Sequence, residues 1–399
     1  MIINFMRSQV VQILSNSDNK DYMVDIAKEK VYINQDEEYY EEYTKWRNDP
    51  ENRFAYSFQH DSREHTYVDG EGFADRLAQT EEKSALTSCF SYLGGLLLLI
   101  LLFQIIQYFL MHHVFDSDFI GWIYFSQRSS FSPISADQEI VYCAVRLTAY
   151  VTAALVSASV LKMPRKVVLP NEKVSLSLMG FGISLSLIFL ILARVFDMSI
   201  AKVFGMAGID MCSYSYAYSE NIAAQCFYLS MEIFFVPLLA EIIFRGFVLQ
   251  LFRQFGDYFA VLISSFACAV IYHDVSEMLF MFSFGMIFGS LVLRSGSLKL
   301  SIVVRITVMA VYCLLNHMSV VWDSSYRYFW ECAVSIAIVV AAAVAMPYFR
   351  SYIRPSEKPA DDTTELTAVQ KLKLTLNSGI FIVWLLLAML VVILNIRIV

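Results

Sequence analysis

Nine long apolar runs limit what this chain can fold into. The hydrocarbon core of a bilayer, about 30 Å thick, is crossed by about 20 helical residues, and each run reaches or approaches that length. None of the runs alternates apolar and polar residues as a membrane strand does, and backbone groups in lipid must be paired within the span. The sequence therefore predicts an all-α fold, a polytopic transmembrane bundle of about eight to nine helices. The runs lie at residues 92–111, 140–161, 174–196, 223–252, 257–273, 277–294, 299–318, 328–349 and 377–396.

The composition agrees with a membrane protein and excludes an ordinary soluble domain. Of the 399 residues, 57% are hydrophobic and 17% are charged, and the mean hydropathy is +0.53. We expect the lipid bilayer as the main partner, and no nucleic acid. The opening segment, MIINFMRSQVVQILSNSDNK, has no apolar core like that of a signal peptide, so the run at 92–111 is the first predicted membrane signal. The seven cysteines show no paired spacing, which argues against a disulfide framework or a zinc ribbon.

Lysines and arginines predict the orientation of the chain, because cytoplasmic loops carry an excess of them. If the spans alternate in direction, the basic loop residues all fall on one side of the membrane. The N-terminus is then cytoplasmic and the C-terminus external, and we expect the plasma membrane. The residues concerned are Lys162, Arg165, Lys166, Lys173, Arg253, Arg294, Lys299, Arg350, Arg354 and Lys358.

The chain divides into four predicted parts. Residues 1–88 form a polar region with 18 Asp and Glu against 10 Lys and Arg. We interpret this region as an acidic, partly helical and partly disordered cytoplasmic tail; the alternative is a docking segment for a basic partner. Residues 89–349 are the transmembrane bundle, residues 350–376 a cytoplasmic linker, and residues 377–399 a last transmembrane helix. The sequence shows no internal repeat and no inverted pair of broken helices of the kind that transporters use.

A carboxylate and a guanidinium interrupt the fourth apolar run, in the stretch PLLAEIIFRG at residues 237–246. Glu241 and Arg245 are four residues apart, with the glutamate nearer the N-terminus, so they share one helix face in the favourable order. Charges at this depth are costly and mark a functional interior by default. On these two residues alone, a functional site and a structural ion pair that holds helices together are equally supported.

The surroundings of these charges resemble the CPBP family, the CAAX protease and bacteriocin-processing membrane proteins. PLLAEIIFRGFVLQLF is similar to the first motif of the family, in which two adjacent glutamates precede Arg-Gly by three residues. Downstream, FMFSFGMIFGSLVLRSGSLKLSI has Gly285, Gly289 and the run from Ser295 to Leu298 in the order that the family shows. The resemblance covers residues 223–318 approximately, and it implies a helix bundle built around an intramembrane peptidase site.

Most catalytic positions of that family are changed in this chain. The resemblance implies a first glutamate that activates water, two histidines that help to hold the site, and an asparagine that stabilises the oxyanion. The retained motif residues are Glu241, Arg245 and His273, while the changed positions are Ala240 for the first glutamate, Ala269 for a phenylalanine, Arg305 for the second histidine and Met309 for the asparagine.

Arg305 is the most informative change, because a guanidinium repels a metal cation and pairs with a carboxylate instead. If the fourth, fifth and seventh spans pack as in the family, Glu241, Arg245, His273 and Arg305 meet in one buried polar cluster. Glu232, nine residues before Glu241, faces the opposite side of an ideal helix and is not expected to join them. A metal site needs three or four converging ligands. We therefore expect no bound metal. If a metal does bind, we expect His273 to be a ligand.

Three functions remain open at this point. The favoured one is a non-catalytic pseudoprotease that acts as a membrane scaffold, regulator or immunity-type protein, with a membrane protein or peptide as partner. The alternative is an active intramembrane endopeptidase that processes a membrane-embedded, prenylated or leader-type peptide through an atypical site, with zinc as cofactor. A transporter or channel is disfavoured, because repeats are absent and Arg146, Arg194 and Glu331 are scattered or lie near the ends of spans. Loss of coupled catalytic groups commonly costs several orders of magnitude in rate, which favours the pseudoprotease.

Overall fold

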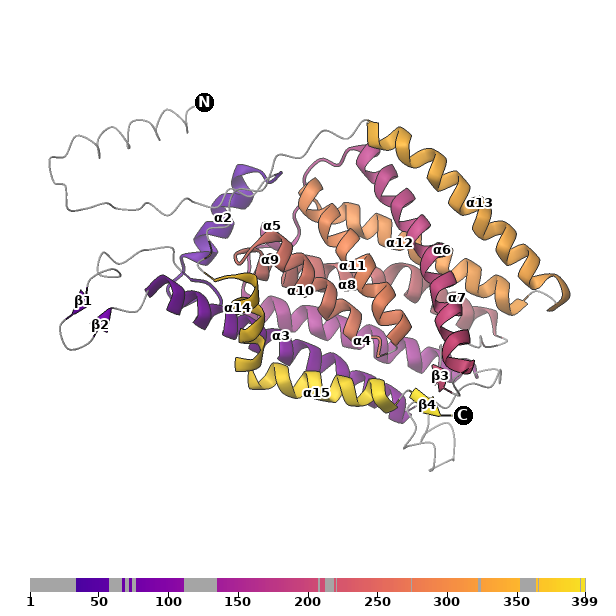
Figure 1. Ribbon diagram of the computed structural model, residues 1–399, viewed down its shortest axis with the longest axis horizontal. Helices are drawn as coiled ribbons and strands as arrows, with labels where there is room; N and C mark the ends of the chain where they lie inside the picture. Colours follow the sequence, from indigo (N-terminus) through magenta and orange to yellow (C-terminus); the bar gives the residue numbers. More distant parts are fainter. Residues whose placement is uncertain are drawn as a thin grey trace.

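The computed structural model is a bundle of long helices with two short pairs of strands (Figure 1). The prediction of an all-α transmembrane bundle is confirmed. Predictions made for residues 1–33, for most of the 112–139 loop and for residues 352–363 lie outside the described residues. The structure describes residues 34–56, 67–68, 72–73, 77–110, 135–206, 209–211, 219, 221–273, 275–321, 324–351, 364, 366–394 and 396–398.

Seven of the described helices are long and apolar enough to cross a membrane, and a bent pair of helices makes an eighth span if it is counted as one. The bent pair turns by 86° and consists of α14 (Ala368–Lys373) with η5 (Leu374–Asn377), followed by α15 (Gly379–Leu394). The seven long spans belong to α3 (Leu77–Phe109), α4 (Ala136–Leu161), α6 (Leu176–Met206), the composite helix Ile222–Arg253, α11 (Val275–Ser295), α12 (Leu298–Val321) and α13 (Ser324–Ser351).

The fifth predicted span, at residues 257–273, is wrong in length. It contains α10 (Asp257–Val270), an apolar helix of 14 residues. At 1.5 Å per residue such a helix is about 21 Å long, which is less than the ~30 Å of a hydrocarbon core. The apolar sequence continues through Ile271, but the backbone turns there and His273 has a φ of 55°. Composition alone therefore overestimated the length of this helix.

Of the two short strand pairs, one is a local hairpin and the other connects distant parts of the chain. β1 (Tyr67–Val68) pairs antiparallel with β2 (Gly72–Phe73), and β3 (Ile209–Met211) pairs antiparallel with β4 (Ile396–Ile398). The second pair places the end of α15 beside the connection that follows α6. Because α15 also packs along α3, the last predicted span is part of the bundle.

Two apolar cores hold the helices together. The larger core contains side chains from α3, α4, the composite helix, α10 and α15, including Phe90, Phe252 and Trp384. The smaller core lies between α6, α11 and α12 and includes Phe284 and Phe288. The composite helix contacts α4, α10 and α12, so it lies where the two cores meet.

The described part of the N-terminal region packs onto one end of the bundle. α2 (Glu37–Arg47) directs the side chain of Tyr39 inward, where its hydroxyl donates a hydrogen bond to Gln250 Oε1 at 2.6 Å. Lys166 forms an ion pair with Asp36, directly before α2. These contacts place α2 beside the basic loop that follows α4 and beside the end of the composite helix.

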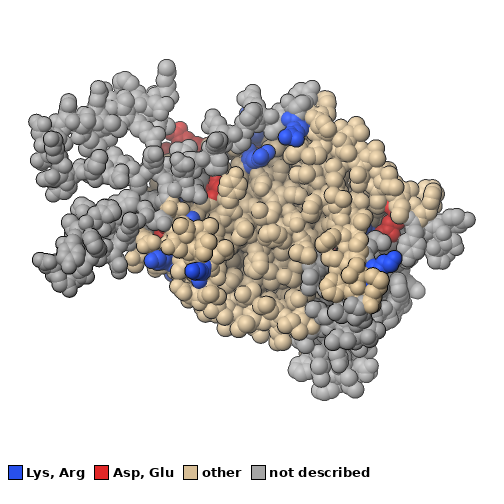
Figure 2. All heavy atoms as spheres, in the orientation of Figure 1, with Lys and Arg blue, Asp and Glu red and all other residues tan. Residues whose placement is uncertain are grey.

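The outer surface agrees with a position in a bilayer. Figure 2 shows a broad uncharged surface, with the visible lysine, arginine, aspartate and glutamate side chains at its margins. Large apolar side chains point outward from several helices; Val344 of α13 is 73% exposed and Leu386 of α15 is 61% exposed. Membrane-spanning helices of this kind imply that lipid covers these side chains.

Candidate functional site

The composite helix that carries Glu241 includes π-helical turns. Pro237 has no amide hydrogen to donate to the carbonyl four residues back. Directly before it, Val236 donates to Met231 O, five residues back, which is the π-helical spacing. Such turns are rare and occur frequently at functional sites. The composite helix consists of α7 (Ile222–Ser230), η3 (Met231–Phe235), α8 (Val236–Glu241), η4 (Ile242–Val248) and α9 (Leu249–Arg253).

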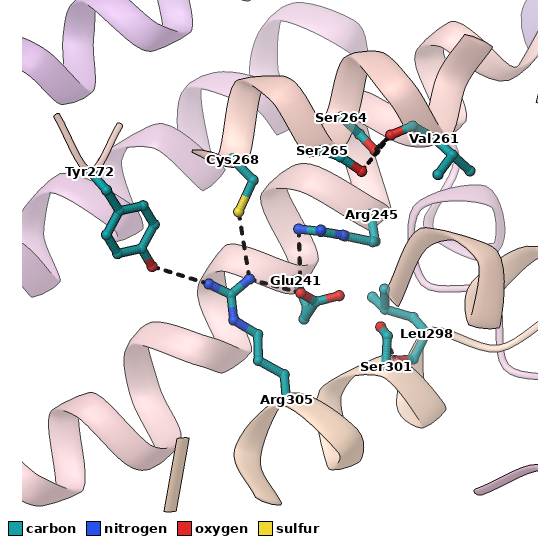
Figure 3. A network of polar contacts seen from close by, with 10 residues as sticks. All are labelled: Glu241, Arg245, Val261, Ser264, Ser265, Cys268, Tyr272, Leu298, Ser301 and Arg305. Atoms are coloured by element: carbon teal, nitrogen blue, oxygen red, sulfur yellow. Dashed lines mark hydrogen bonds and ion pairs between the residues drawn. The ribbon is translucent and has the colours of Figure 1, made fainter. Parts of the chain in front are cut away.

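Three charged side chains meet in the interior of the bundle (Figure 3). Glu241 Oε1 accepts a hydrogen bond from Arg305 Nη1 at 2.8 Å and lies 3.4 Å from Arg245 Nη1. The side chains of Glu241 and Arg245 are 0% exposed, and that of Arg305 is 4% exposed. The structure thus confirms that Glu241 and Arg245 share a helix face, and that Arg305 of α12 reaches them. We call these three residues the ion-pair cluster.

The remaining contacts of Arg305 come from the end of α10. Arg305 Nη2 donates to the hydroxyl of Tyr272 at 3.4 Å, and Nη1 lies 3.8 Å from Cys268 Sγ. Sequence reasoning missed both residues. Their spacing of four residues gave no usable signal, because α10 ends at Val270 and Tyr272 lies beyond it.

His273 forms its hydrogen bond with α3. Its Nε2 lies 3.0 Å from Gln104 Oε1 and donates to it, because an amide oxygen can only accept. Gln104 Nε2 in turn donates to Ile271 O at 2.7 Å. Burial lowers the pKa of His273 to about 4, so the imidazole is neutral at pH 7. Of the four residues predicted to meet, the structure therefore brings together the three of the ion-pair cluster. His273 is instead hydrogen-bonded to Gln104 of α3.

The changed motif positions carry side chains without acid–base chemistry. Ala240, directly before Glu241, is 0% exposed, and Ala269 is 2% exposed. Met309 follows Arg305 by one turn of α12 and is partly buried. None of these three side chains can abstract a proton or donate a hydrogen bond.

The side chains around Glu241 do not match the ligands of a zinc ion. Zinc takes three or four nitrogen, sulfur or oxygen ligands, and a catalytic site keeps one position open. Here the Glu241 carboxylate faces one guanidinium nitrogen at 2.8 Å and a second at 3.4 Å, and two such cations repel a third. Among the described residues, no group of three or more His, Cys, Asp and Glu is arranged to hold a metal.

Two glycines of the motif region allow close approach of neighbouring elements. A Cβ atom at Gly246, directly after Arg245, would lie 2.8 Å from Val168 O in α5 (Arg165–Val168). A Cβ atom at Gly285 would lie 2.7 Å from Ser265 Cβ, because α11 packs directly on α10. Larger side chains at either position would push apart the helices that enclose the ion-pair cluster.

Two further ion pairs connect helices around the cluster. Arg146 of α4 contacts Glu232 of η3 at 2.5 Å, and Arg194 of α6 contacts Glu331 of α13 at 2.6 Å. Sequence reasoning treated Arg146, Arg194 and Glu331 as scattered charges, and the structure corrects this. The partners are separated by 86 and 137 residues, so no local pattern could connect them. Glu232 pairs with α4 while Glu241 pairs with α12, in agreement with the opposite faces predicted from their spacing.

A comparison with known families matches the segment that carries this site. Residues 221–311 match the family model described as Type II CAAX prenyl endopeptidase Rce1-like. The matched segment contains the composite helix, α10, α11 and the part of α12 that carries Arg305. No curated protein and no solved structure matches the chain. The chain is thus a multi-pass membrane protein in which residues 221–311 are similar to the Rce1-like domain of the CPBP family.

Proposed function

We propose that this protein is a non-catalytic pseudoprotease of the CPBP family, which acts in the membrane as a scaffold, regulator or immunity-type protein. The hydrogen bond of 2.8 Å between Arg305 and Glu241 carries the proposal. In the family pattern a histidine would stand at the position of Arg305. A guanidinium there ties the remaining glutamate into an ion pair instead of leaving it beside a neutral imidazole.

Three changes together support the loss of catalysis. Peptide hydrolysis needs a base, groups that hold the attacking water, and a donor for the oxyanion in one place. Ala240 replaces the base of the family pattern, Arg305 replaces a histidine, and Met309 replaces the oxyanion donor. Since such groups act as a unit, the loss of one commonly costs several orders of magnitude in rate.

An active intramembrane endopeptidase with an atypical site is the second candidate. It is favoured by the retention of Glu241 and His273, and by the buried Glu241 Oε2, which has no hydrogen-bond partner among the described residues and is able to accept one from water. Its substrate would be a membrane-embedded, prenylated or leader-type peptide, and zinc would be its cofactor. Under either proposal the partner is a membrane protein or peptide within the bilayer.

We expect the purified protein to leave peptide and prenylated-peptide substrates intact. Cleavage would be measured by mass spectrometry in detergent, with and without a chelator, beside a variant that combines Ala240→Glu, Arg305→His and Met309→Asn. Activity in this restored variant alone would show that the changed positions account for the loss. Chelator-sensitive cleavage by the unchanged protein, abolished by Glu241→Gln, would establish the peptidase instead.

We also propose that residues 1–88 and 351–376 are cytoplasmic and that residues 112–139 and 197–222 are external, in the plasma membrane. This orientation requires α10 to cross the membrane although it is shorter than the seven long spans, and the asymmetry of lysine and arginine supports it. The contacts of α2 with the basic loop after α4 support a common side for the tail and that loop.

Cysteine labelling tests the orientation. An impermeant thiol reagent added to intact cells is expected to miss a cysteine introduced at position 40 or 360 and to label one introduced at position 120. The background is a variant without its native cysteines, and permeabilised cells provide the control for reactivity. Labelling of position 360 in intact cells would mean that the orientation is reversed.

A further inference from the structure

The ion-pair cluster carries an excess positive charge. It holds one carboxylate, Glu241, against the two guanidinium groups of Arg245 and Arg305. Arginine is not deprotonated in proteins, so neither guanidinium can become neutral. Among the described residues, no second carboxylate lies within ion-pair distance of either arginine. The ion-pair cluster therefore contains one unbalanced unit of positive charge.

The excess is assigned to Arg245, because both Nη atoms of Arg305 have partners. All three nitrogen atoms of the Arg245 side chain are buried and form no hydrogen bond among the described residues. Its contacts are the 3.4 Å approach of Nη1 to Glu241 Oε1 and the ring of Phe288, 5.9 Å from the guanidinium carbon. A buried charge without hydrogen-bond partners is costly, and such a group calls for an explanation such as a bound ion or water.

The neighbouring hydroxyl groups do not supply the missing acceptor. Figure 3 draws Ser264 and Ser265 of α10 and Ser301 of α12, two helices that pack against η4. Ser264 and Ser265 each donate to Val261 O, and Ser301 donates to Leu298 O. These serines are therefore engaged within their own helices, and none of them accepts a hydrogen bond from Arg245.

We propose that a small monovalent anion, with chloride as the natural candidate, binds Arg245. Nη1 faces Glu241, so Nε and Nη2 are the nitrogen atoms left to bind the anion. An anion supplies an acceptor and also neutralises the excess charge, whereas water supplies only the acceptor. The carboxylate of an external peptide cannot reach Arg245 in this state, because the side chain is 0% exposed. The inference does not depend on whether the protein is a peptidase.

Thermal unfolding of the detergent-purified protein tests this site. Sodium chloride replaces sodium gluconate at constant ionic strength, so that only the anion changes. An anion that binds the folded state alone raises Tm with concentration until the site is full. We expect a rise in chloride of several degrees that saturates, a similar rise in bromide, and none in gluconate. Equal Tm values in all three salts would mean that Arg245 binds water only, and would overturn the proposal.

Three variants test whether the chloride response arises at the ion-pair cluster. Arg245→Leu should abolish the chloride response, whereas Arg194→Leu, in a pair at the edge of the bundle, should retain it. Glu241→Gln removes the carboxylate next to the anion, so it should shift the half-saturating chloride concentration downward by tenfold or more. This second variant decides the question if Arg245→Leu does not fold. A chloride response unchanged in Arg245→Leu, or a midpoint unmoved by Glu241→Gln, would contradict an anion at Arg245.

Discussion

Glu241→Gln is expected to destabilise the protein by about 3–5 kcal/mol, because removing one partner of a buried ion pair leaves the opposite charge uncompensated. The effect should lie at the upper end of that range. Glu241 is the counter-charge of two guanidinium groups, so its loss leaves both Arg245 and Arg305 in the interior. Thermal unfolding in detergent, followed by circular dichroism or by the fluorescence of a thiol dye, measures this loss.

Glu38→Gln is the matched control for this substitution. Glu38 also forms an ion pair, with Lys166 at 3.3 Å, but its side chain is 68% exposed. Exposed pairs of this kind contribute about 0–1 kcal/mol, so the control should change Tm little. Similar Tm values for Glu241→Gln and the unchanged protein would mean that the Glu241 carboxylate is not in a buried pair.

Gly94→Val is expected to displace α15 from α3. A Cβ atom at Gly94 would lie 2.6 Å from Phe381 Cα and 2.6 Å from Phe381 N, and backbone atoms cannot move aside as a side chain can. Overpacking of this kind typically costs about 1–3 kcal/mol and occasionally more. We expect a lower Tm and faster proteolysis in the linker before α14, since α15 contributes Trp384 to the larger core.

Gly95→Val is the control, because the two glycines are adjacent in the same helix. A Cβ atom at Gly95 has nothing within 4 Å. Both variants carry the same cost of a β-branched residue in a helix, so the difference between their Tm values isolates the contact with α15. Equal effects of the two substitutions would show that α15 does not pack on α3 at this point.

The parts of the fold that the sequence predicted depend on local patterns. Long apolar runs identified the spans, and the spacing of four residues placed Glu241 and Arg245 on one face. Counting from the run Ser295–Leu298 placed Arg305 in the family pattern, and the structure brings it to 2.8 Å from Glu241. A helix fixes the direction of each side chain, so a correct register was sufficient for this contact once the helices were taken to pack as the resemblance implies.

The parts that the sequence could not predict depend on contacts between distant segments. Gln104 precedes its partner His273 by 169 residues, and nothing in the apolar run of α3 distinguishes that glutamine as a partner of the histidine. The buried position of Tyr39 in an acidic, aromatic segment likewise results from its docking onto Gln250. The end of α10 was missed because apolar composition continues past the last helical residue.

The motif region of this chain keeps small residues where helices pack closely, but it lacks most of the expected acid–base groups. Gly246 and Gly285 still permit the close approaches that hold the composite helix, α5, α10 and α11 together. According to the resemblance, the groups that would take and donate protons are the ones that differ, at Ala240, Arg305 and Met309. A bundle retained around a changed site is what we expect of a protein that binds a membrane partner without cleaving it.

A double-mutant cycle between Glu241 and Arg305 tests most directly whether an ion pair has replaced the peptidase site. Arg305→Met alone leaves Glu241 paired with Arg245, so its cost should be smaller than that of Glu241→Gln. In the Glu241→Gln background the same substitution removes an uncompensated buried charge, and it should be harmless or stabilising. We predict a coupling free energy of about 0.5–3 kcal/mol from unfolding of the four proteins. Additive effects of the two substitutions would show that the side chains do not interact, and would contradict the account.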